Sequence, residues 1–194
     1  MSAFINNVRI GLTIAVLSGC AHQNSIKTTT AVARPSGFVL VREYVDSVKT
    51  DHGDEYRKVQ YGWDYDQGVA VQRISNMDDK LISTRAEPNL TLETTPNELE
   101  YAYSLIRQHP DLRKIASQKD ALLHGGFSLT TDPNEVNSGP ANSQCGLKSR
   151  CIHIIISGGL DGEKSLAHAI VNLASGLIVD AHYRGEKSFV SKVK

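Results

Sequence analysis

The strongest local constraint on the fold is a helix signal set between segments patterned as strands. Thr95-Pro96-Asn97-Glu98 has the spacing of a capping box, with proline at the first helical position. Apolar residues follow at helical spacing, and Pro110 ends the run because it disfavours helical geometry at His109. The sequence therefore predicts one main helix over about 95–108.

Short segments rich in β-branched and aromatic residues lie on both sides of that helix. Turn residues separate them, which favours antiparallel pairing between neighbours. We expect an α+β fold in one domain over 37–184, with antiparallel sheet and the helix packed across it. The predicted strands cover residues 37–48, 56–65, 69–75, 80–85, 121–130, 151–157, 166–173 and 177–183.

The N-terminus carries a motif for export. Arg9 precedes an apolar run of about eight residues, which is too short to span a bilayer and has the size of a signal-peptide core. The run ends in Leu17-Ser18-Gly19-Cys20, which resembles the lipobox of bacterial lipoproteins. The resemblance implies that residues 1–19 are removed and that Cys20 is acylated. The alternatives are an ordinary secretory signal and a chance cysteine after an apolar run.

Lipidation at Cys20 would anchor the protein to a membrane of the bacterial cell envelope. Ala21 follows the cysteine where an aspartate would imply retention in the inner membrane, so the resemblance favours the outer membrane. Residues 20–36 are polar and small and are expected to form a flexible tether, and 185–194 a loose tail. The chain holds 21 basic and 21 acidic residues, so we expect no nucleic-acid partner.

Two further cysteines fit an oxidising compartment. Cys145 and Cys151 form an even pair once Cys20 is consumed by lipid. Their spacing matches neither a redox C-x-x-C motif nor a zinc knuckle. We expect a structural disulfide between them.

A predicted hairpin at the end of the domain gathers histidines. If Ala174-Ser175-Gly176 forms a three-residue loop, Leu173 pairs with Leu177, and His168 lies opposite His182. Asp180 then shares their face, and His153 on the neighbouring strand adds an imidazole. These four residues are candidate ligands for a divalent metal, while the alternative is ordinary surface histidines.

An aromatic stripe lies on one face of a predicted strand. Tyr61, Trp63 and Tyr65 alternate along it, and such a stripe suits either core packing beneath the helix or a surface that binds a partner. The two alternatives differ in the solvent exposure of Trp63.

The segment Val171–Val179 resembles a hairpin of PepSY-like domains and of the small N-terminal domains of copper amine oxidases. In those domains a helix packs on an antiparallel sheet, and an apolar-Asp-apolar-x-x-Gly hairpin recurs. Trp63–Val71 has a similar pattern, so the chain can hold two related halves, 37–93 and 94–184. The resemblance implies a fold and no catalytic residues.

Motifs for catalysis are incomplete in this sequence. His124-Gly125-Gly126-Phe127 suits an esterase oxyanion loop, but the chain has no G-x-S-x-G nucleophile motif to accompany it. We expect a non-catalytic envelope module that binds another envelope protein and needs no cofactor. A small-ligand or metal carrier is the alternative, and a hydrolase is a second one.

Overall fold

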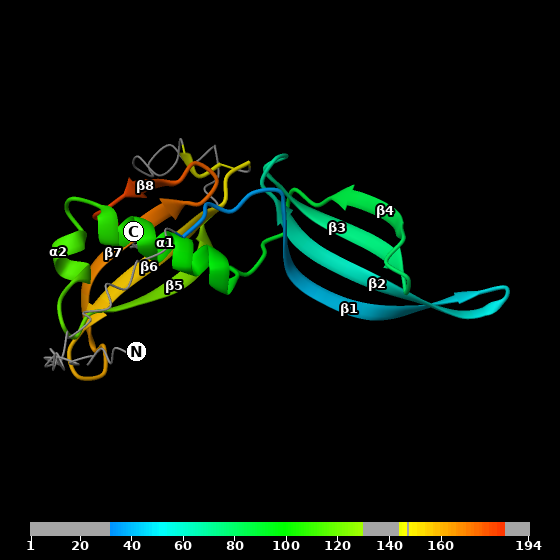
Figure 1. Cartoon of the computed structure of the whole chain (residues 1–194), viewed down its shortest axis with the longest axis horizontal. Coiled ribbons are helices and arrows are strands. Elements are labelled where there is room, and N and C mark those ends of the chain that lie inside the picture. The colour runs from blue at the N-terminus through cyan, green and yellow to red at the C-terminus, as the bar shows by residue number, and fades with distance from the viewer. Residues whose placement is uncertain (1–31, 130–143, 147, 185–194) are drawn as a thin grey trace, which may run out of the picture. The chain divides into compact units, whose positions relative to one another are not determined.

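The computed structural model describes residues 32–129, 144–146 and 148–184. Within them, two four-stranded antiparallel sheets follow one another along the chain, with the helices between them (Figure 1). The elements in order are β1 (Phe38–Thr50), β2 (Gly53–Asp64), β3 (Val69–Asn76), β4 (Leu81–Ala86), α1 (Pro96–Gln108), α2 (Arg113–Ala116), β5 (Leu122–Leu129), β6 (Cys151–Gly158), β7 (Lys164–Asn172) and β8 (Leu177–Asp180).

The first sheet is a meander in the order β1-β2-β3-β4. β1 and β2 pair along their full lengths, whereas β3 pairs with β2 only from Arg57 onward, so the tip of the first hairpin projects as a two-stranded arm (Figure 1). Phe38 packs on Gly62, where any side chain would collide with its ring and with the carbonyl oxygen of Val39. The glycine thus lets β1 lie close to β2.

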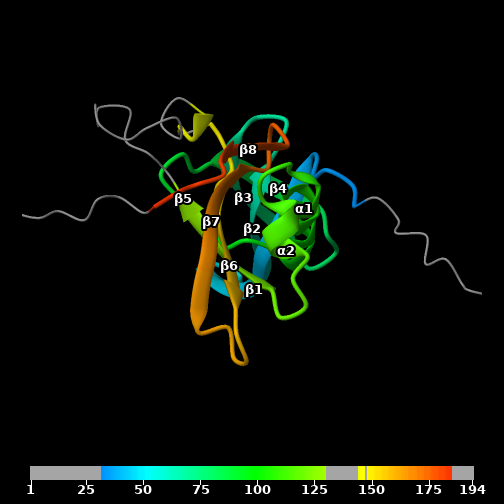
Figure 2. The same cartoon turned by 90° about the vertical axis from the view of Figure 1, so that its left-hand side faces the viewer.

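The second sheet, in the order β5-β6-β7-β8, carries the main core. Both views show α1 and α2 against one face of this sheet (Figures 1 and 2). Ala102 and Ile106 of α1 and Leu112 are fully buried there. They meet Ile152, Ile154 and Ile156 of β6, and Ala169 and Val171 of β7.

The helix begins where its sequence predicts. The Thr95 hydroxyl accepts a hydrogen bond from the Glu98 backbone N–H, and the Glu98 carboxylate accepts one from the Thr95 N–H. The helix ends at Gln108, and His109 before the proline is extended, with φ −70° and ψ 132°. The capping-box prediction and the single main helix are confirmed.

Strands dominate the architecture, so the expected α+β class describes it only approximately. Two antiparallel sheets with one main helix make it mostly β. Contacts group the described residues into one compact unit. Cys20 and the segments 1–19 and 185–194 lie outside the described residues, as does most of the expected tether. No described helix is both long and apolar enough to cross a membrane.

The last hairpin differs from its prediction by one residue at the turn. Asn172 pairs with Leu177, so the loop holds four residues and not three, although Gly176 is left-handed as expected, with φ 73°. Leu173 is fully buried and donates its backbone N–H to the Arg150 carbonyl oxygen at 2.9 Å. Burial of that side chain favours the longer loop over pairing with Leu177, which is 55% exposed.

The longer loop changes the register of the pairs next to the turn. Val171 now opposes Ile178, which joins the main core. A bulge then restores the predicted register, so Ile170 opposes Asp180. The strand ends there, and the expected pairing of His168 with His182 does not form.

The two segments that carry the PepSY-like resemblance form matching turns. Gly68 donates its N–H to the Asp64 carbonyl oxygen at 2.8 Å, and Gly176 does the same to Asn172 at 2.9 Å. Both glycines are left-handed, and the side chains of Asp64 and Asn172 each accept a backbone N–H inside the turn. The turns join the second and third strands of the first sheet but the third and fourth of the second. No helix occurs in the described residues 32–95, so the two halves share a hairpin and differ in topology.

The expected disulfide between Cys145 and Cys151 is present, with Cα atoms 5.5 Å apart. Both cysteines are buried and pack against Ile170 in a small cluster, joined by Leu129, Val179 and Tyr183. This cluster covers part of the face of β7 that the sequence predicted to be exposed. Ile170 is therefore core on the side opposite the helix.

Replacing Cys145 and Cys151 together with alanine should lower the free energy of unfolding by about 2 kcal/mol, because the short loop no longer restricts the unfolded chain. Urea denaturation of the two proteins measures this change. Reductant should lower the midpoint of the native protein similarly and leave that of the double variant unchanged. An unchanged native midpoint after full reduction would contradict the prediction.

Candidate functional site

A buried ion pair lies where the two sheets and the helix start meet. Arg150 immediately precedes β6, and Glu98 is in the first turn of α1; their side chains are 3% and 1% exposed. The Arg150 Nε donates to Glu98 Oε1 at 3.1 Å, and Nη2 donates to Oε2 at 3.2 Å. This is the bidentate geometry in which arginine binds a carboxylate most specifically.

The remaining guanidinium donors are also used. Nη1 donates to the Leu92 carbonyl oxygen at 2.9 Å and to the Ser128 hydroxyl at 3.4 Å. Nη2 donates to the Glu93 carbonyl oxygen at 2.5 Å. A guanidinium has five N–H groups, and the bonds to these four residues account for all of them. Arg150 is therefore a structural tie with no donor left for a ligand.

The Glu98 carboxylate is held ionised by its neighbours. Burial alone would raise its pKa, but the hydrogen bonds and charge of Arg150, with the Tyr65 hydroxyl and the Thr95 N–H, hold the pKa below its usual value. Tyr65 donates its hydroxyl to Glu98 Oε1 at 2.5 Å. Burial, and then the charge of Glu98, raises the pKa of Tyr65 far above its usual value, so this tyrosine stays a donor.

Trp63 forms the other side of the same region. The residue is 7% exposed and packs with Ala70 and Leu92. The Arg150 guanidinium carbon lies 5.5 Å from its ring centroid. The indole Nε1 is one of two buried polar side-chain atoms of the described residues without a hydrogen-bond partner; the other is Arg57 Nε, whose guanidinium already pairs with Glu55.

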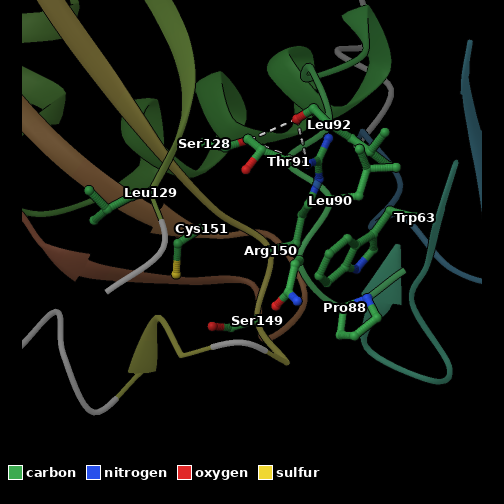
Figure 3. Close-up of a pocket in the computed structure, with 11 residues that line it drawn as sticks. Trp63, Pro88, Leu90, Thr91, Leu92, Ser128, Leu129, Ser149, Arg150 and Cys151 are labelled. Atoms are coloured by element: carbon green, nitrogen blue, oxygen red, sulfur yellow. Dashed lines mark hydrogen bonds between the residues drawn. The ribbon is translucent and has the colours of Figure 1, made fainter. Parts of the chain in front are cut away.

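A pocket of about 250 Å³ lies beside this tryptophan (Figure 3). The close-up shows the indole between the Arg150 side chain and Pro88. The segment between β4 and α1 forms one wall, and the ends of β5 and β6 form the other. The lining residues are Trp63, Pro88, Asn89, Leu90, Thr91, Leu92, Ser128, Leu129, Ser149, Arg150 and Cys151.

The predicted aromatic stripe has three different environments. Trp63 is buried at the pocket, and Tyr65 bonds to Glu98 beside the helix start. Tyr61 is half-buried, accepts a hydrogen bond from Gln72 Nε2 at 2.5 Å and stacks against Tyr44, with ring centroids 6.3 Å apart. The stripe thus combines core packing with one residue that borders a cavity.

Of the predicted metal ligands, the structure brings His153 and His168 together. His153 Nε2 and His168 Nδ1 are 2.9 Å apart, and the Ser165 hydroxyl lies 2.6 Å from His168 Nε2. The Tyr183 ring packs edge-on against His153 at 5.1 Å. Burial, and then the charges of His168 and His124, lower the pKa of His153, so the pair favours a neutral imidazole there.

The other two predicted ligands lie elsewhere. His182 Nε2 faces the Asp111 carboxylate at 3.8 Å, and its backbone N–H donates to Asp180 at 2.8 Å. The chain still runs beside β7, since the Tyr183 backbone N–H donates to the His168 carbonyl oxygen at 3.1 Å, but the His182 side chain lies near Asp111. No group of three or more His, Cys, Asp or Glu side chains suited to a metal occurs in the part of the chain that the structure describes.

The role of Arg150 was not predicted from the sequence. The sequence assigned Glu98 to the capping box, and the partner lies 52 residues further along the chain. The one available signal was Glu98 itself, at a position of the helix that is buried. A buried carboxylate requires a cation, so a basic partner could be expected. Nothing local identifies which of the chain's basic residues supplies it.

No protein-family model matches this chain, and no curated protein matches it.

Replacing Glu98 with glutamine should lower the free energy of unfolding by about 3 kcal/mol, because it leaves the Arg150 charge buried and unpaired. Since the folded-state pKa of Glu98 is lowered, its contribution is present above the unfolded pKa and is lost as the pH falls through the folded value. As the pH falls from about 5 to about 3, the free energy of unfolding should therefore decrease less in the variant than in the native protein. These limits lie on either side of the usual glutamate pKa of about 4.3.

Denaturant titrations across this pH range measure both effects. Glu100→Gln is the matched control, because Glu100 lies on the same helix but is exposed. Similar stability losses in the two variants would show that the Arg150–Glu98 pair does not carry the effect.

Proposed function

We propose that the protein is a lipid-anchored, non-catalytic binding module of the bacterial cell envelope. The observation that carries the proposal is the Leu17-Ser18-Gly19-Cys20 motif directly after an apolar run of signal-peptide length. The acyl chains on Cys20 would hold the domain at a membrane surface, with the outer membrane favoured by Ala21.

The cysteine pair supports the compartment. Disulfides persist in the periplasm and at cell surfaces and are rare in the cytosol. The Cys145–Cys151 bond is buried in the domain, where it packs against Ile170, and so acts as a structural part of the fold. A domain with a buried disulfide suits an exported protein.

The charged and polar side chains of the domain support binding over catalysis. Its buried ion pair has all its hydrogen bonds within the protein, so neither Arg150 nor Glu98 is available to act on a substrate. The His168 ring contacts the Ser165 hydroxyl through one nitrogen and the His153 imidazole through the other. In a hydrolase triad, a carboxylate occupies the position that His153 has here. The accessible pocket instead offers an aromatic wall at Trp63 and an exposed wall that includes Asn89 and Thr91.

Cys20→Ser should abolish incorporation of a labelled palmitate analogue in a bacterial host, because that sulfur is the acceptor of the first lipid. The native chain should take up label and fractionate with membranes. The Cys145→Ala, Cys151→Ala double variant is the control and should remain labelled. Equal labelling of the native chain and of Cys20→Ser would overturn the anchoring proposal.

A second candidate function, binding of a divalent metal, is favoured by the imidazole pair. Two nitrogens bound at about 2.1 Å to one ion are about 3.0–3.4 Å apart, close to the 2.9 Å between His153 Nε2 and His168 Nδ1. The Ser165 hydroxyl would fix the orientation of the His168 ring from its other nitrogen. An ion bound by both nitrogens would replace the hydrogen bond between the two rings.

If this pair binds metal, zinc sulfate should raise the Tm of the native protein and leave that of His168→Ala unchanged. His182→Ala is the matched control and should keep the full response, because His182 lies against Asp111. Thermal unfolding monitored by circular dichroism measures the shift. The same response in His168→Ala and the native protein would exclude the imidazole pair as the site.

A further inference from the structure

We propose that the outer edge of β1 pairs antiparallel with the same edge of a second copy of this chain, with the two-fold axis at Tyr44. The first sheets of the two copies then form one continuous sheet. The inference goes beyond the envelope function proposed above and does not rest on it, because every residue that carries it belongs to the first sheet.

The edge itself is long and exposed. β1 has 13 residues, borders the first sheet (Figure 1), and pairs with β2 alone in the part of the chain that the structure describes. Leu40, Tyr44 and Val45 are 44%, 39% and 53% exposed along it. A long edge strand with exposed apolar side chains is a template on which another strand can pair.

The backbone groups that face away from β2 belong to Glu43, Val45 and Ser47. Successive residues of an antiparallel strand alternate between bonding to the neighbouring strand and facing away from it. The Ser47 N–H donates to the Asp46 carboxylate at 2.9 Å, which places this N–H on the outer side of β1. The register between the bulge and the turn is continuous, so Glu43 and Val45 have the same orientation. They supply the donors and acceptors for a second strand.

The charges along β1 select one register for two identical strands. If the sheet is continued with its faces kept, the axis passes between one residue and its own copy. An axis at Arg42, Glu43 or Asp46 would bring like charges together, which is destabilising. An axis at Val45 would leave these charges opposite uncharged residues. An axis at Tyr44 places Arg42 of each copy opposite Asp46 of the other.

The structure already holds both partners of that ion pair in suitable places. The Arg42 guanidinium carbon lies 5.3 Å from the Tyr44 ring centroid and 5.4 Å from that of Tyr61, so its side chain is on the face that carries these rings. The Asp46 carboxylate is exposed, and its bond to the outer N–H of Ser47 keeps it at the edge. Two Arg42–Asp46 pairs would therefore flank the two Tyr44 rings, in the pairs whose Cα atoms are only about 4.5 Å apart.

The other edge of the first sheet has no such complementarity. β4 is six residues long, and Arg85 is its one charged residue. The Arg85 guanidinium already pairs with Glu87 in the same chain. The self-complementary charge pattern is thus specific to β1.

Cross-linking tests the register in the full chain carrying Cys20→Ser, in which the remaining native cysteines form the Cys145–Cys151 bond. After oxidation with diamide, Tyr44→Cys should give a covalent dimer on a non-reducing gel, because the two copies of this residue face each other within disulfide reach. Ser47→Cys is the matched control, since it is also exposed on β1. The two copies of residue 47 would be about 20 Å apart in this register, so it should stay monomeric.

Charge reversal tests the ion pairs. Sedimentation velocity of the same full chain should show a monomer–dimer equilibrium, and Arg42→Asp or Asp46→Arg alone should weaken it by at least about tenfold, because two attractive pairs become repulsive. The double variant Arg42→Asp, Asp46→Arg should restore dimerisation. Arg85→Asp, on the opposite edge, should leave it unchanged. All variants keep the same N-terminal apolar run, so association through that run would not distinguish them.

Three results would overturn the proposal: a native chain that stays monomeric, equal cross-linking through positions 44 and 47, or no recovery in the double variant while circular dichroism shows it folded. None of these measurements involves acylation. Loss of palmitate labelling would therefore remove the anchoring proposal and leave the dimer, and a monomeric chain would do the reverse.

Discussion

The interaction on which the rest of the structure depends is the buried pair of Arg150 and Glu98. It connects the start of α1, the segment before it, the end of β5 and the entry into β6 through one guanidinium. Tyr65, just after β2, adds the first sheet to this network by donating to the same carboxylate. A buried charge is tolerated only when its bonds are complete, so these segments must assemble together.

The same network shapes the neighbouring pocket. All N–H donors of Arg150 are bonded to groups of the protein. Its guanidinium therefore contributes to the pocket a surface that faces the Trp63 ring, and no free donor. Trp63 is held against it at 5.5 Å with its own nitrogen unpaired. The polar groups that the recess presents to solvent therefore come from its exposed wall, which includes Asn89 and Thr91.

The histidines of the second sheet show that a local sequence pattern can identify neighbouring side chains and still misplace one of them. The sequence predicted that His153 and His168 approach each other, and they do, at 2.9 Å. It also placed His182 opposite His168, which required a three-residue loop. The loop is one residue longer, but a bulge restores the predicted register, so that Ile170 opposes Asp180. The strand ends at that pair, and the His182 side chain lies near Asp111 instead. The end of the strand, and not the length of the turn, separates the two imidazoles.

The sequence by itself determined the elements whose causes are local: the capped helix after Thr95, its end before Pro110, the strands and the Cys145–Cys151 bond. These depend on backbone preferences and on chain segments only a few residues apart. The tertiary structure alone decided which basic residue neutralises Glu98, which face of β7 the disulfide covers, and that Trp63 borders a cavity. Those outcomes depend on contacts across tens of residues, whose partners are selected by burial and complete hydrogen bonding and not by any local pattern.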